Sequence, residues 1–578
     1  MEKIADVQAS ATVDWSPLGD IYVKKTVHYH LSWDKNLDQC SVAIAPYGGP
    51  IALLQKLSKS GGDSKSILIY SQAGNPISSI PWEGGRLIGM GWNSNEDLIC
   101  ILEEGTMAAY SINGLLKYSR PVSREVREHR VLDCKFFHTM EGSGGFAVMT
   151  NCYQFFVVAD TCRPRDEIRV KKVADLPSMT VRPNCWNVLT PQCNILVSVE
   201  EKLYILDQYE AIPQSVLTSK KDPSVYWAEI AVSVDGKAVA LVDKGGYLWG
   251  GTSDFKTCET EMDLQSTAKV LAMEWGAKDF FVLVMEKLIF VKGFGKHWCK
   301  YPGKLGCCLQ PEVDGLRLVS NTTSEFIHRV TSQSLAVLRI GSMEPGALLN
   351  DAFKEYEGDE SHKADEYIRF IKDKLPDAIL QCIKAAGEEF EPALQQSLLR
   401  SARFGKGFLG PEISSEVVNE FVEMCHHLRV LNSVRMEKIG VPITLRQYYR
   451  LSTGVLTDRL INRELYPVAL EICNYLRVPN VDGEVKILRQ WAIKKVKDKT
   501  IQDKTAAEII IHRLKNTNVI VPFAEIARCA KEEGRKELAS LLLDHEVHAR
   551  EQVPLLMEMR KADLALDKAI ESGDPQLG

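Results

Sequence analysis

Apolar and polar residues alternate in short segments through the first 340 residues. From Leu87 to Ile112, apolar runs are separated by brief polar turns, and the same pattern returns at residues 229–251 and 270–293. Asp235 and Gly236 form one of the dipeptides that favour a tight hairpin. Short apolar runs bounded by turn residues are typical of antiparallel strands. The pattern therefore predicts a β-rich N-terminal half.

The predicted strands group into repeating units. A large apolar residue ends a strand in six of them, namely Trp33, Trp92, Phe136, Trp186, Val232 and Trp275, and a seventh unit covers residues Cys307–Val330. A repeat of about 40–50 residues with three or four strands is typical of β-propeller blades. We predict a divergent seven-bladed β-propeller without a repeated Trp-Asp motif. Two β-sandwiches in tandem are the alternative.

Helical periodicity replaces this pattern from residue 341 onward. Apolar residues now recur every three or four positions, which places them on one face of a helix. These faces contain Leu465, Ala469, Ile472 and Leu476, then Val485, Leu488, Ala492 and Val496, then Ala507, Ile510, Ile511 and Leu514, and then Phe523, Ile526, Ala527 and Ala530. Short helices joined by brief turns are typical of an α-solenoid of stacked helix pairs. We therefore predict two domains, a β-propeller at residues 1–340 and an α-solenoid at residues 341–578, with a globular helical bundle as the alternative for the second.

Composition excludes several classes of protein. The 578 residues are 45% hydrophobic and 25% charged, with a net charge of −6, which excludes fibrous and wholly disordered chains and gives no overall positive charge for nucleic acid. No apolar stretch reaches the roughly 18 residues of a membrane-spanning helix. Glu2 and Asp6 stand where a secretory signal would be apolar, and the 15 Cys fit reduced thiols. We expect a soluble, cytoplasmic protein that reaches membranes only through partners.

One glycine motif matches a dinucleotide-binding pattern in its letters alone. Residues Gly405–Gly410 read G-x-G-x-x-G, but a helical segment precedes them and Pro411 follows. A dinucleotide site needs a strand before the glycines and a helix after them, because the pyrophosphate binds at the helix N-terminus. We therefore predict a turn between helices and no nucleotide cofactor.

Three groups of Cys and His residues resemble metal sites without the required ligand spacing. In chain order they are Cys307-Cys308, Cys425-His426-His427 and His545-Glu546-Val547-His548. The last is one residue short of the H-E-x-x-H pattern of zinc proteases, and no C-x-x-C pair occurs in the chain. We predict structural roles for these residues, with no catalytic residue, no cofactor-binding residue and no metal site. Elemental analysis of the purified chain should accordingly find no stoichiometric zinc.

Two clusters of basic residues are predicted to lie on solvated surface. Lys494, Lys495, Lys497 and Lys499 lie near the end of a predicted helix, where positive charge stabilises the helix dipole. Arg124, Arg127 and Arg130 alternate with glutamates. Membrane or nucleic-acid contact is the alternative for the lysines, but no aromatic residues interleave with them as single-stranded nucleic acid would require.

A series of residue strings matches one known family in order along the chain. In the strand-rich half the strings are Ala45–Leu54, Arg130–Asp133 with Phe137–Thr139, Cys185–Leu189 and Val313–Gly315. In the helical half they are Pro345–Leu349, Lys363–Tyr367, Ser397–Arg400, Leu428–Asn432, Glu551–Leu556 and Lys568–Asp574. On these strings the chain resembles the vacuolar protein sorting-associated protein 16 family over nearly its whole length. The resemblance implies an N-terminal propeller followed by a C-terminal solenoid.

The same resemblance implies a function that composition and spacing do not reveal. It implies a non-enzymatic scaffold subunit of the HOPS and CORVET tethering complexes, which hold endosomal, lysosomal or vacuolar membranes together before SNARE-driven fusion. The implied partners are the other complex subunits and a Sec1/Munc18-type protein, vacuolar protein sorting-associated protein 33. The implied location is the cytosolic face of endosomes and lysosomes or of the vacuole. A coat-type or intraflagellar scaffold, or a propeller enzyme, is the alternative, and no residue is assigned to a partner.

The end of the chain departs from the family pattern. In the family the string Lys568–Asp574 leads into further solenoid helices, whereas four residues follow it here. Because the family docks its Sec1/Munc18 partner on those later helices, we expect that this chain does not recruit that partner. We also expect a last helix at about residues 562–570 with Ala562, Leu566 and Ala569 uncovered, since a terminal repeat has no following neighbour.

Overall fold

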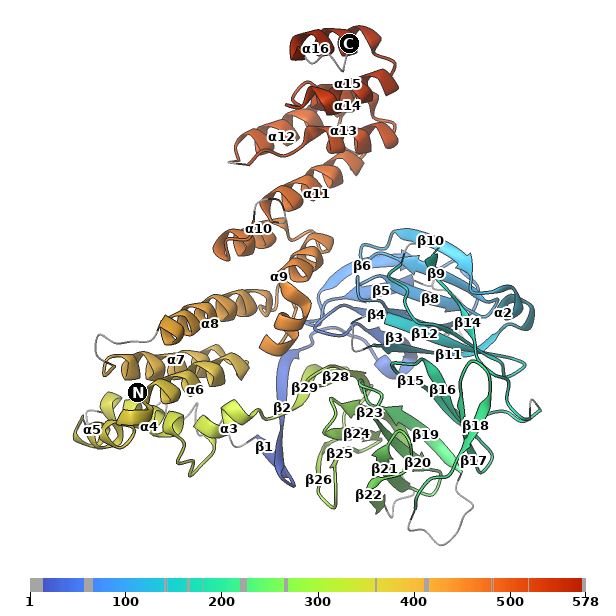
Figure 1. The fold of residues 1–578 in the computed structure, drawn as a ribbon. Helices are drawn as coiled ribbons and strands as arrows, with labels where there is room; N and C mark the ends of the chain where they lie inside the picture. Colours follow the sequence, from blue (N-terminus) through green and yellow to red (C-terminus); the bar gives the residue numbers. More distant parts are fainter. Residues whose placement is uncertain are drawn as a thin grey trace. The chain divides into compact units, whose positions relative to one another are not determined.

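Seven antiparallel sheets make up the N-terminal part of the chain in the computed structural model (Figure 1). The structure describes residues 14–56, 66–139, 142, 144–163, 167–178, 180–218, 226–264, 269–358, 361–409, 415–479, 481, 483–517 and 519–573. The first strands of successive sheets lie next to one another, so the sheets are the blades of a propeller around a central channel. The predicted seven-bladed propeller is confirmed.

The strands of each blade follow one another along the chain. The first three blades contain β3 (Cys40–Ile44), β4 (Ile51–Gln55), β5 (Ser66–Tyr70) and β6 (Pro76–Pro81); β7 (Leu87–Trp92), β8 (Leu98–Leu102), β9 (Thr106–Tyr110) and β10 (Leu116–Pro121); and β11 (Val131–His138), β12 (Gly144–Thr150), β13 (Phe155–Val158) and β14 (Lys171–Lys172). The next three contain β15 (Cys185–Leu189), β16 (Asn194–Val199), β17 (Lys202–Leu206) and β18 (Ala211–Gln214); β19 (Trp227–Val232), β20 (Ala238–Asp243), β21 (Tyr247–Thr252) and β22 (Cys258–Asp263); and β23 (Val270–Gly276), β24 (Phe280–Met285), β25 (Leu288–Gly293) and β26 (Trp298–Pro302). The seventh contains β27 (Cys308–Pro311), β28 (Gly315–Val319), β29 (Thr323–Arg329), β2 (Ile21–His30) and β1 (Trp15–Leu18), and a short helix α2 (Arg124–His129) connects the second and third blades.

An N-terminal strand closes the ring of blades. β2 pairs with β29 in an antiparallel register that sets Val23 opposite Arg329. The first blade consequently begins at β3, and Trp33 lies between β2 and β3 instead of ending an inner strand. The prediction for Trp33 is therefore wrong, because the apolar run before it is the closing strand. The indole of Trp33 donates a hydrogen bond to the carbonyl of Asn321 at 2.9 Å.

Tryptophans on inner strands join neighbouring blades. Trp92 on β7 donates its indole N–H to the carbonyl of Ala43 on β3 at 3.1 Å, and Trp275 on β23 donates to Ala231 on β19 at 3.2 Å. Both side chains are buried between blades, where an indole N–H needs a hydrogen-bond partner. The recurrence of tryptophan in the sequence repeat thus follows from the packing between blades.

The turn between β19 and β20 has no room for a side chain at Gly236. This residue has φ +69, and a Cβ there would overlap the carbonyl oxygen of Thr190 in the preceding blade. We expect Gly236→Ala to lower the free energy of unfolding of the propeller by about 2–5 kcal/mol, the sum of a left-handed backbone penalty and overpacking. The matched control is Gly295→Ala, which has φ +70 and nothing within 4 Å. Equal denaturation midpoints for Gly236→Ala and Gly295→Ala would contradict the steric overlap expected between a Cβ at position 236 and Thr190.

Helices follow the propeller. They are α3 (Ser332–Leu338), α4 (Pro345–Glu357), α5 (Ser361–Phe370), α6 (Leu375–Glu388), α7 (Pro392–Lys406), α8 (Ser415–Val434), α9 (Leu445–Asn462), α10 (Tyr466–Tyr475), α11 (Glu484–Lys497), α12 (Asp503–Lys515), α13 (Phe523–Glu532), α14 (Lys536–Leu543), α15 (Ala549–Glu558) and α16 (Ala562–Ser572). The chain divides into two compact units, residues 1–450 and 451–578, so the first unit includes the propeller and the earlier helices. The helical region is confirmed, and the domain limits at residues 340 and 341 stay a prediction.

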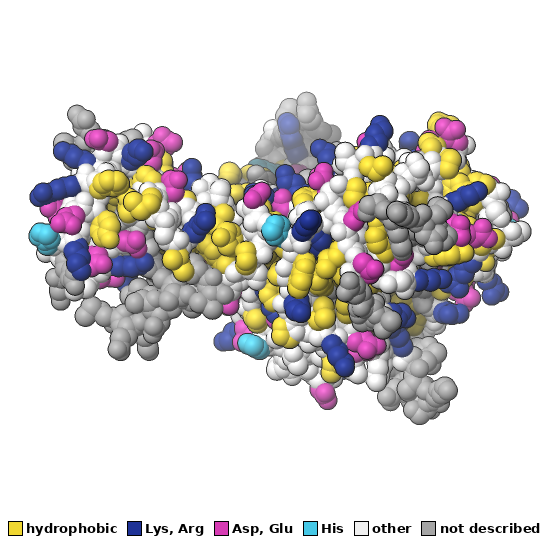
Figure 2. All heavy atoms as spheres, turned by 90° about the horizontal axis from the view of Figure 1, so that it is seen from below, with side chains coloured by type: hydrophobic (Ala, Val, Ile, Leu, Met, Phe, Trp, Pro, Cys, Tyr) yellow, Lys and Arg dark blue, Asp and Glu magenta, His cyan; other side chains and the backbone are white. Residues whose placement is uncertain are grey.

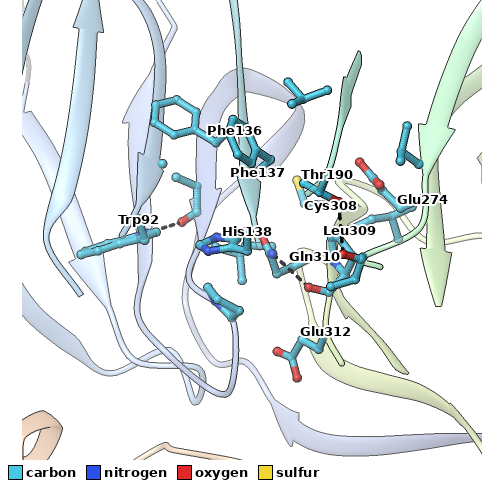
Figure 3. A pocket seen from close by; sticks show the side chains of 18 of the residues that line it. Trp92, Phe136, Phe137, His138, Thr190, Glu274, Cys308, Leu309, Gln310 and Glu312 are labelled. Atoms are coloured by element: carbon cyan, nitrogen blue, oxygen red, sulfur yellow. Dashed lines mark hydrogen bonds between the residues drawn. The ribbon is translucent and has the colours of Figure 1, made fainter. Parts of the chain in front are cut away.

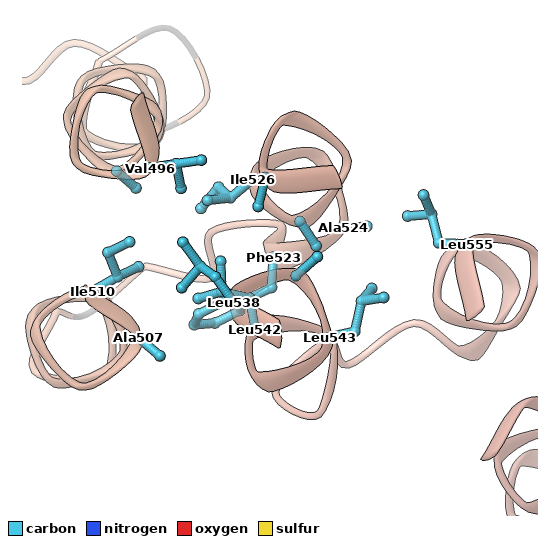
Figure 4. Packing of buried hydrophobic residues seen from close by; sticks show 14 of the residues in the cluster. Val496, Ala507, Ile510, Phe523, Ala524, Ile526, Leu538, Leu542, Leu543 and Leu555 are labelled. Carbon is cyan, nitrogen blue, oxygen red and sulfur yellow. The ribbon is translucent and has the colours of Figure 1, made fainter. Parts of the chain in front are cut away.

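Successive helices of the second unit share one apolar core. Ile510 of α12, Ile526 of α13 and Leu542 of α14 are each 0% exposed and point toward one another (Figure 4). The helices in contact within this unit are adjacent or next but one in the chain, as in the predicted solenoid. In α16, Leu566 is exposed as predicted, but Ala569 is buried because this face of the helix packs on α15.

Arg535 connects the end of α11 to α14. Its guanidinium donates to the carbonyls of Val496 and Ile501 at 2.8 and 2.6 Å and forms an ion pair with Asp503 at 2.7 Å. The last carbonyls of a helix have no partner within the helix, so a neighbouring side chain stabilises them. Hydrogen bonds therefore join helices of the unit that are not consecutive in the chain, in addition to the apolar core.

Candidate functional site

The first strands of the seven blades line a cavity of about 250 Å³ at the propeller axis, called the propeller channel below. The lining residues come from different blades: His138 from β11, Glu274 from β23 and Glu312 from the segment after β27, whereas the indole of Trp92 on β7 is directed away from them (Figure 3). Aliphatic side chains such as Val188 separate the polar groups. The lining of the propeller channel thus combines polar and apolar groups.

Most polar side chains of the channel already have partners within the chain. Asn187 donates to the carbonyl of Ile230 at 2.9 Å, and Thr190 donates to the carbonyl of Val234 at 3.2 Å. The carboxylate of Glu312 forms a salt bridge with Arg317, which is described below. These groups hold neighbouring blades in register and leave little hydrogen-bonding capacity for a ligand.

Glu274 differs from the other polar groups of the channel. Its carboxylate points from β23 toward the cavity, and within the described part of the chain it has neither a hydrogen bond nor an ion pair (Figure 3). Burial raises the pKa of Glu274 to about 7; the positive charge of Lys135 opposes this rise and the negative charge of Glu229 adds to it. The channel therefore contains a carboxyl group that titrates near neutral pH and has no counterion in contact with it.

A buried salt bridge lies where the propeller meets the helices of the first unit. Arg317 on β28 and Glu312 are both 0% exposed, with Nε–Oε1 and Nη2–Oε2 distances of 2.7 and 3.1 Å. Nη2 of Arg317 also donates to the carbonyl of Pro442, and Gln447 of α9 donates to Glu312 at 2.6 Å. A buried charge pair is favourable only when its remaining hydrogen-bonding groups are satisfied, as they are here.

Aromatic and basic side chains from β2 extend this contact. Tyr29 donates its hydroxyl to the carbonyl of Arg435 at 2.7 Å, and the His28 ring stacks on Phe390 with centroids 4.0 Å apart. Burial, together with the nearby Arg317 and Arg435 charges, holds the pKa of His28 well below its usual value, so the ring stays neutral. The propeller and the helices between α6 and α9 are therefore joined by desolvated, specific contacts.

The glycine motif belongs to a helix. Gly405 lies in α7, where a Cβ would come within 2.9 Å of Leu349 and Ile379 on α4 and α6, so the glycine permits close helix packing. Gly407 is the C-cap of α7, and Gly410 lies outside the described residues. The element before the motif is α7, which includes Gly405 and Lys406, and the described part of the predicted turn begins at Gly407.

Glu546 of the His-Glu-Val-His segment stabilises the start of a helix. Its carboxylate accepts the N–H of Ala524 in the first turn of α13 at 2.7 Å and that of His548 at 3.0 Å. Carboxylates are favourable at a helix N-terminus because of the helix dipole. The described residues contain no group of three His, Cys, Asp or Glu side chains placed to hold a metal ion.

The cysteine pairs are thiols without metal-site geometry. Burial raises the pKa of Cys307 and of Cys308 to about 12, and it also raises that of Cys425. All three are free cysteines. A thiol with a raised pKa is a poor nucleophile and a poor metal ligand at neutral pH.

Basic and acidic residues pair across the surface. Lys494 forms a salt bridge with Glu464 at 2.6 Å, and Arg124 forms one with Glu128 at 3.0 Å. Across the described part of the face in Figure 2, basic and acidic side chains are interspersed. Among the described helices, none is both long and apolar enough to cross a bilayer.

Comparison with protein families accounts for both halves of the chain. A family model described as Vps16, N-terminal region, matches residues 11–419, and one described as Vps16, C-terminal region, matches residues 521–578. The chain belongs to the Vps16 family. The resemblance inferred from the residue strings is therefore confirmed.

Relatives align with this Vps16-family chain over almost its whole length. The vacuolar protein sorting-associated protein 16 homolog of Dictyostelium discoideum is 34% identical, with 97% of this chain and 67% of that protein covered. Protein VACUOLELESS1 of Arabidopsis thaliana is 32% identical, with 98% and 68% covered. The β-propeller domain of Cps50 (Swd1) from Myceliophteria thermophila is 9% identical with a TM-score of 0.37, covering 52% of this chain and 99% of that domain. The chain spans about two thirds of the length of the curated relatives.

The interblade and propeller–helix contacts of this family member include residues that its sequence did not single out. Arg317 contacts Pro442 and Arg435 contacts Tyr29 across long separations in the chain, so no local spacing marks these contacts. Glu274 carries a weak signal, since it is the one charged residue in the apolar strand Val270–Gly276. These positions, and not the Cys, His or glycine motifs, form the organised polar sites of the described chain.

Proposed function

We propose that this chain is a non-enzymatic scaffold subunit of the HOPS and CORVET tethering complexes. It acts in vesicle docking and fusion, and thereby in intracellular protein transport, on the cytosolic face of endosomes and lysosomes or of the vacuole. The observation that carries the proposal is the Vps16 family match in both halves of the chain. The names of the relatives, which refer to vacuolar protein sorting, support the cellular process.

The architecture supports a role in binding proteins. Propellers and solenoids present extended surfaces, and each solenoid repeat contacts only its neighbours, so much of its surface is available to partners. The polar groups at the propeller–helix contact are engaged with one another in the described chain, as expected of a rigid connection. We infer that such a chain positions other subunits and does not catalyse a reaction.

The test is reconstitution in cells depleted of their own Vps16-family protein. The full chain, tagged at its N-terminus, should co-purify with the core subunits of both complexes other than the Sec1/Munc18-type protein. An unrelated tagged β-propeller protein at equal expression is the control. Recovery of the folded chain without any tethering-complex subunit would contradict the proposal.

A further inference from the structure

The propeller channel contains an unbalanced negative charge. Lys135 on β11 and Glu229 on β19 are the charged groups that act on Glu274, and Tyr47, His138, Cys308 and Glu312 line the same cavity. Glu312 is neutralised by Arg317, and the Cys308 thiol keeps its proton because burial raises its pKa to about 12. Glu274 and Glu229 thus share the influence of one cation, Lys135.

Lys135 does not contact the Glu274 carboxylate. Its ammonium lies 5.9 Å from the centroid of the Trp186 ring, a distance at which a cation and an aromatic face attract each other. The indole of Trp186 in turn donates to Asp133 at 2.9 Å, which holds the ring in place. Glu274 is therefore left as an acceptor facing an unfilled cavity, with its nearest cation occupied elsewhere.

We propose that the propeller channel binds a primary ammonium or guanidinium group, carried on the lysine or arginine side chain of a partner, with Glu274 as its counterion. A volume of about 250 Å³ accommodates one long, slender side chain. Val42, Met90 and Val188 line the cavity and provide apolar contacts for the methylene stem, while the charged end reaches the carboxylate. This inference goes beyond the proposed scaffold function and is independent of it, since it concerns the purified chain alone.

Binding of the cation is coupled to loss of a proton from Glu274. The free carboxyl is about nine tenths protonated at pH 6 and about one tenth protonated at pH 8, given a pKa of about 7. The cation pairs with the ionised form, so the affinity increases as pH rises through 7 and levels off above 8. The expected gain from pH 6 to pH 8 is about tenfold.

The experiment is an NMR titration of the full-length chain with N-acetyl-lysine amide and N-acetyl-arginine amide at pH 6, 7 and 8. The uncharged N-acetyl-norleucine amide is the matched probe. We expect saturable binding of at least one basic probe with Kd on the order of 1 mM at pH 8, and none of the norleucine probe. An ammonium group can be carried by a peptide side chain or by a small amine, and n-butylammonium distinguishes these two sources. Tighter binding of the lysine amide than of n-butylammonium identifies a peptide side chain. Tighter binding of n-butylammonium identifies a small molecule.

Two variants of opposite effect test the role of Glu274. Glu274→Gln keeps the shape of the side chain and should weaken binding at pH 8 at least tenfold and abolish the pH dependence. Lys135→Met removes the competing cation and should strengthen binding several-fold. Glu286→Gln, at an exposed position in the same blade, is the control and should bind like the parent chain. Absence of saturable binding to a folded chain, or equal affinity of the parent and Glu274→Gln chains, would overturn the proposal.

Discussion

Arg317→Ala is expected to lower the free energy of unfolding of the first unit by about 3–5 kcal/mol, the cost of leaving one member of a buried ion pair uncompensated. The change leaves the Glu312 carboxylate 0% exposed without its counterion and removes the donor to the Pro442 carbonyl. It also removes the guanidinium from the face of Phe326, 5.1 Å away. Tryptophan fluorescence during urea denaturation is a suitable measurement, because nine of the 10 Trp precede residue 341.

Two controls separate the buried pair from the loss of an arginine in general. Arg329→Ala removes an ion pair with Asp279 whose arginine side chain is 46% exposed, and it should cost less than about 1 kcal/mol. The double variant Arg317→Met with Glu312→Gln removes both charges of the pair and should recover much of the stability. Equal midpoints for Arg317→Ala and Arg329→Ala would show that the buried pair does not stabilise the first unit.

Leu542→Ala is expected to destabilise the second unit by about 2–5 kcal/mol, since it removes methyl groups from a core site that is 0% exposed. Leu542 contacts the shared core of α11 to α16, so the cavity affects several helices at once. Loss of helical circular dichroism on heating measures the effect, and the expected fall in melting temperature is on the order of 10 °C. Trp491, which packs against the same core, gives a local signal.

The matched control is the same substitution on the surface. Leu566→Ala changes a leucine that is 59% exposed on α16 and should alter stability by no more than about 0.5 kcal/mol. If Leu542→Ala and Leu566→Ala had the same melting temperature, the core of the second unit would not hold its helices in the arrangement described.

The periodicity of apolar residues predicted the architecture because, within one strand or helix, near neighbours in the sequence determine which residues share the buried face. Alternation at residues 270–293 became β23, β24 and β25, and the three- and four-residue spacing of Phe523, Ile526 and Ala530 became the buried face of α13. Trp33 was misplaced because the pairing of β2 with β29 depends on residues about 300 positions later in the chain. No local pattern carries that information.

The polar sites were harder to predict for the same reason. Arg317 contacts Pro442, 125 residues away, and only the fold brings them together. The prediction that the Gly405 motif and Glu546 have structural roles rested on their sequence context, but the helix packing at Gly405 and the helix N-terminus that Glu546 stabilises became visible only in the structure. Glu274 stood out from its apolar strand, yet its lack of a partner is a property of the assembled channel.

The closure of the propeller by β2 has a consequence during synthesis on the ribosome. β2 must wait for β29, about 300 residues later, which takes on the order of 15–60 s at ordinary translation rates of about 5–20 residues per second. Throughout that interval the side of β2 that pairs with β29 is an open edge that another nascent chain can join. Its sequence, IYVKKTVHYH, places Lys24 and Lys25 at its centre, and charged residues of this kind oppose edge-to-edge association. We expect Lys24 and Lys25 to disfavour edge-to-edge association until β29 is available for pairing.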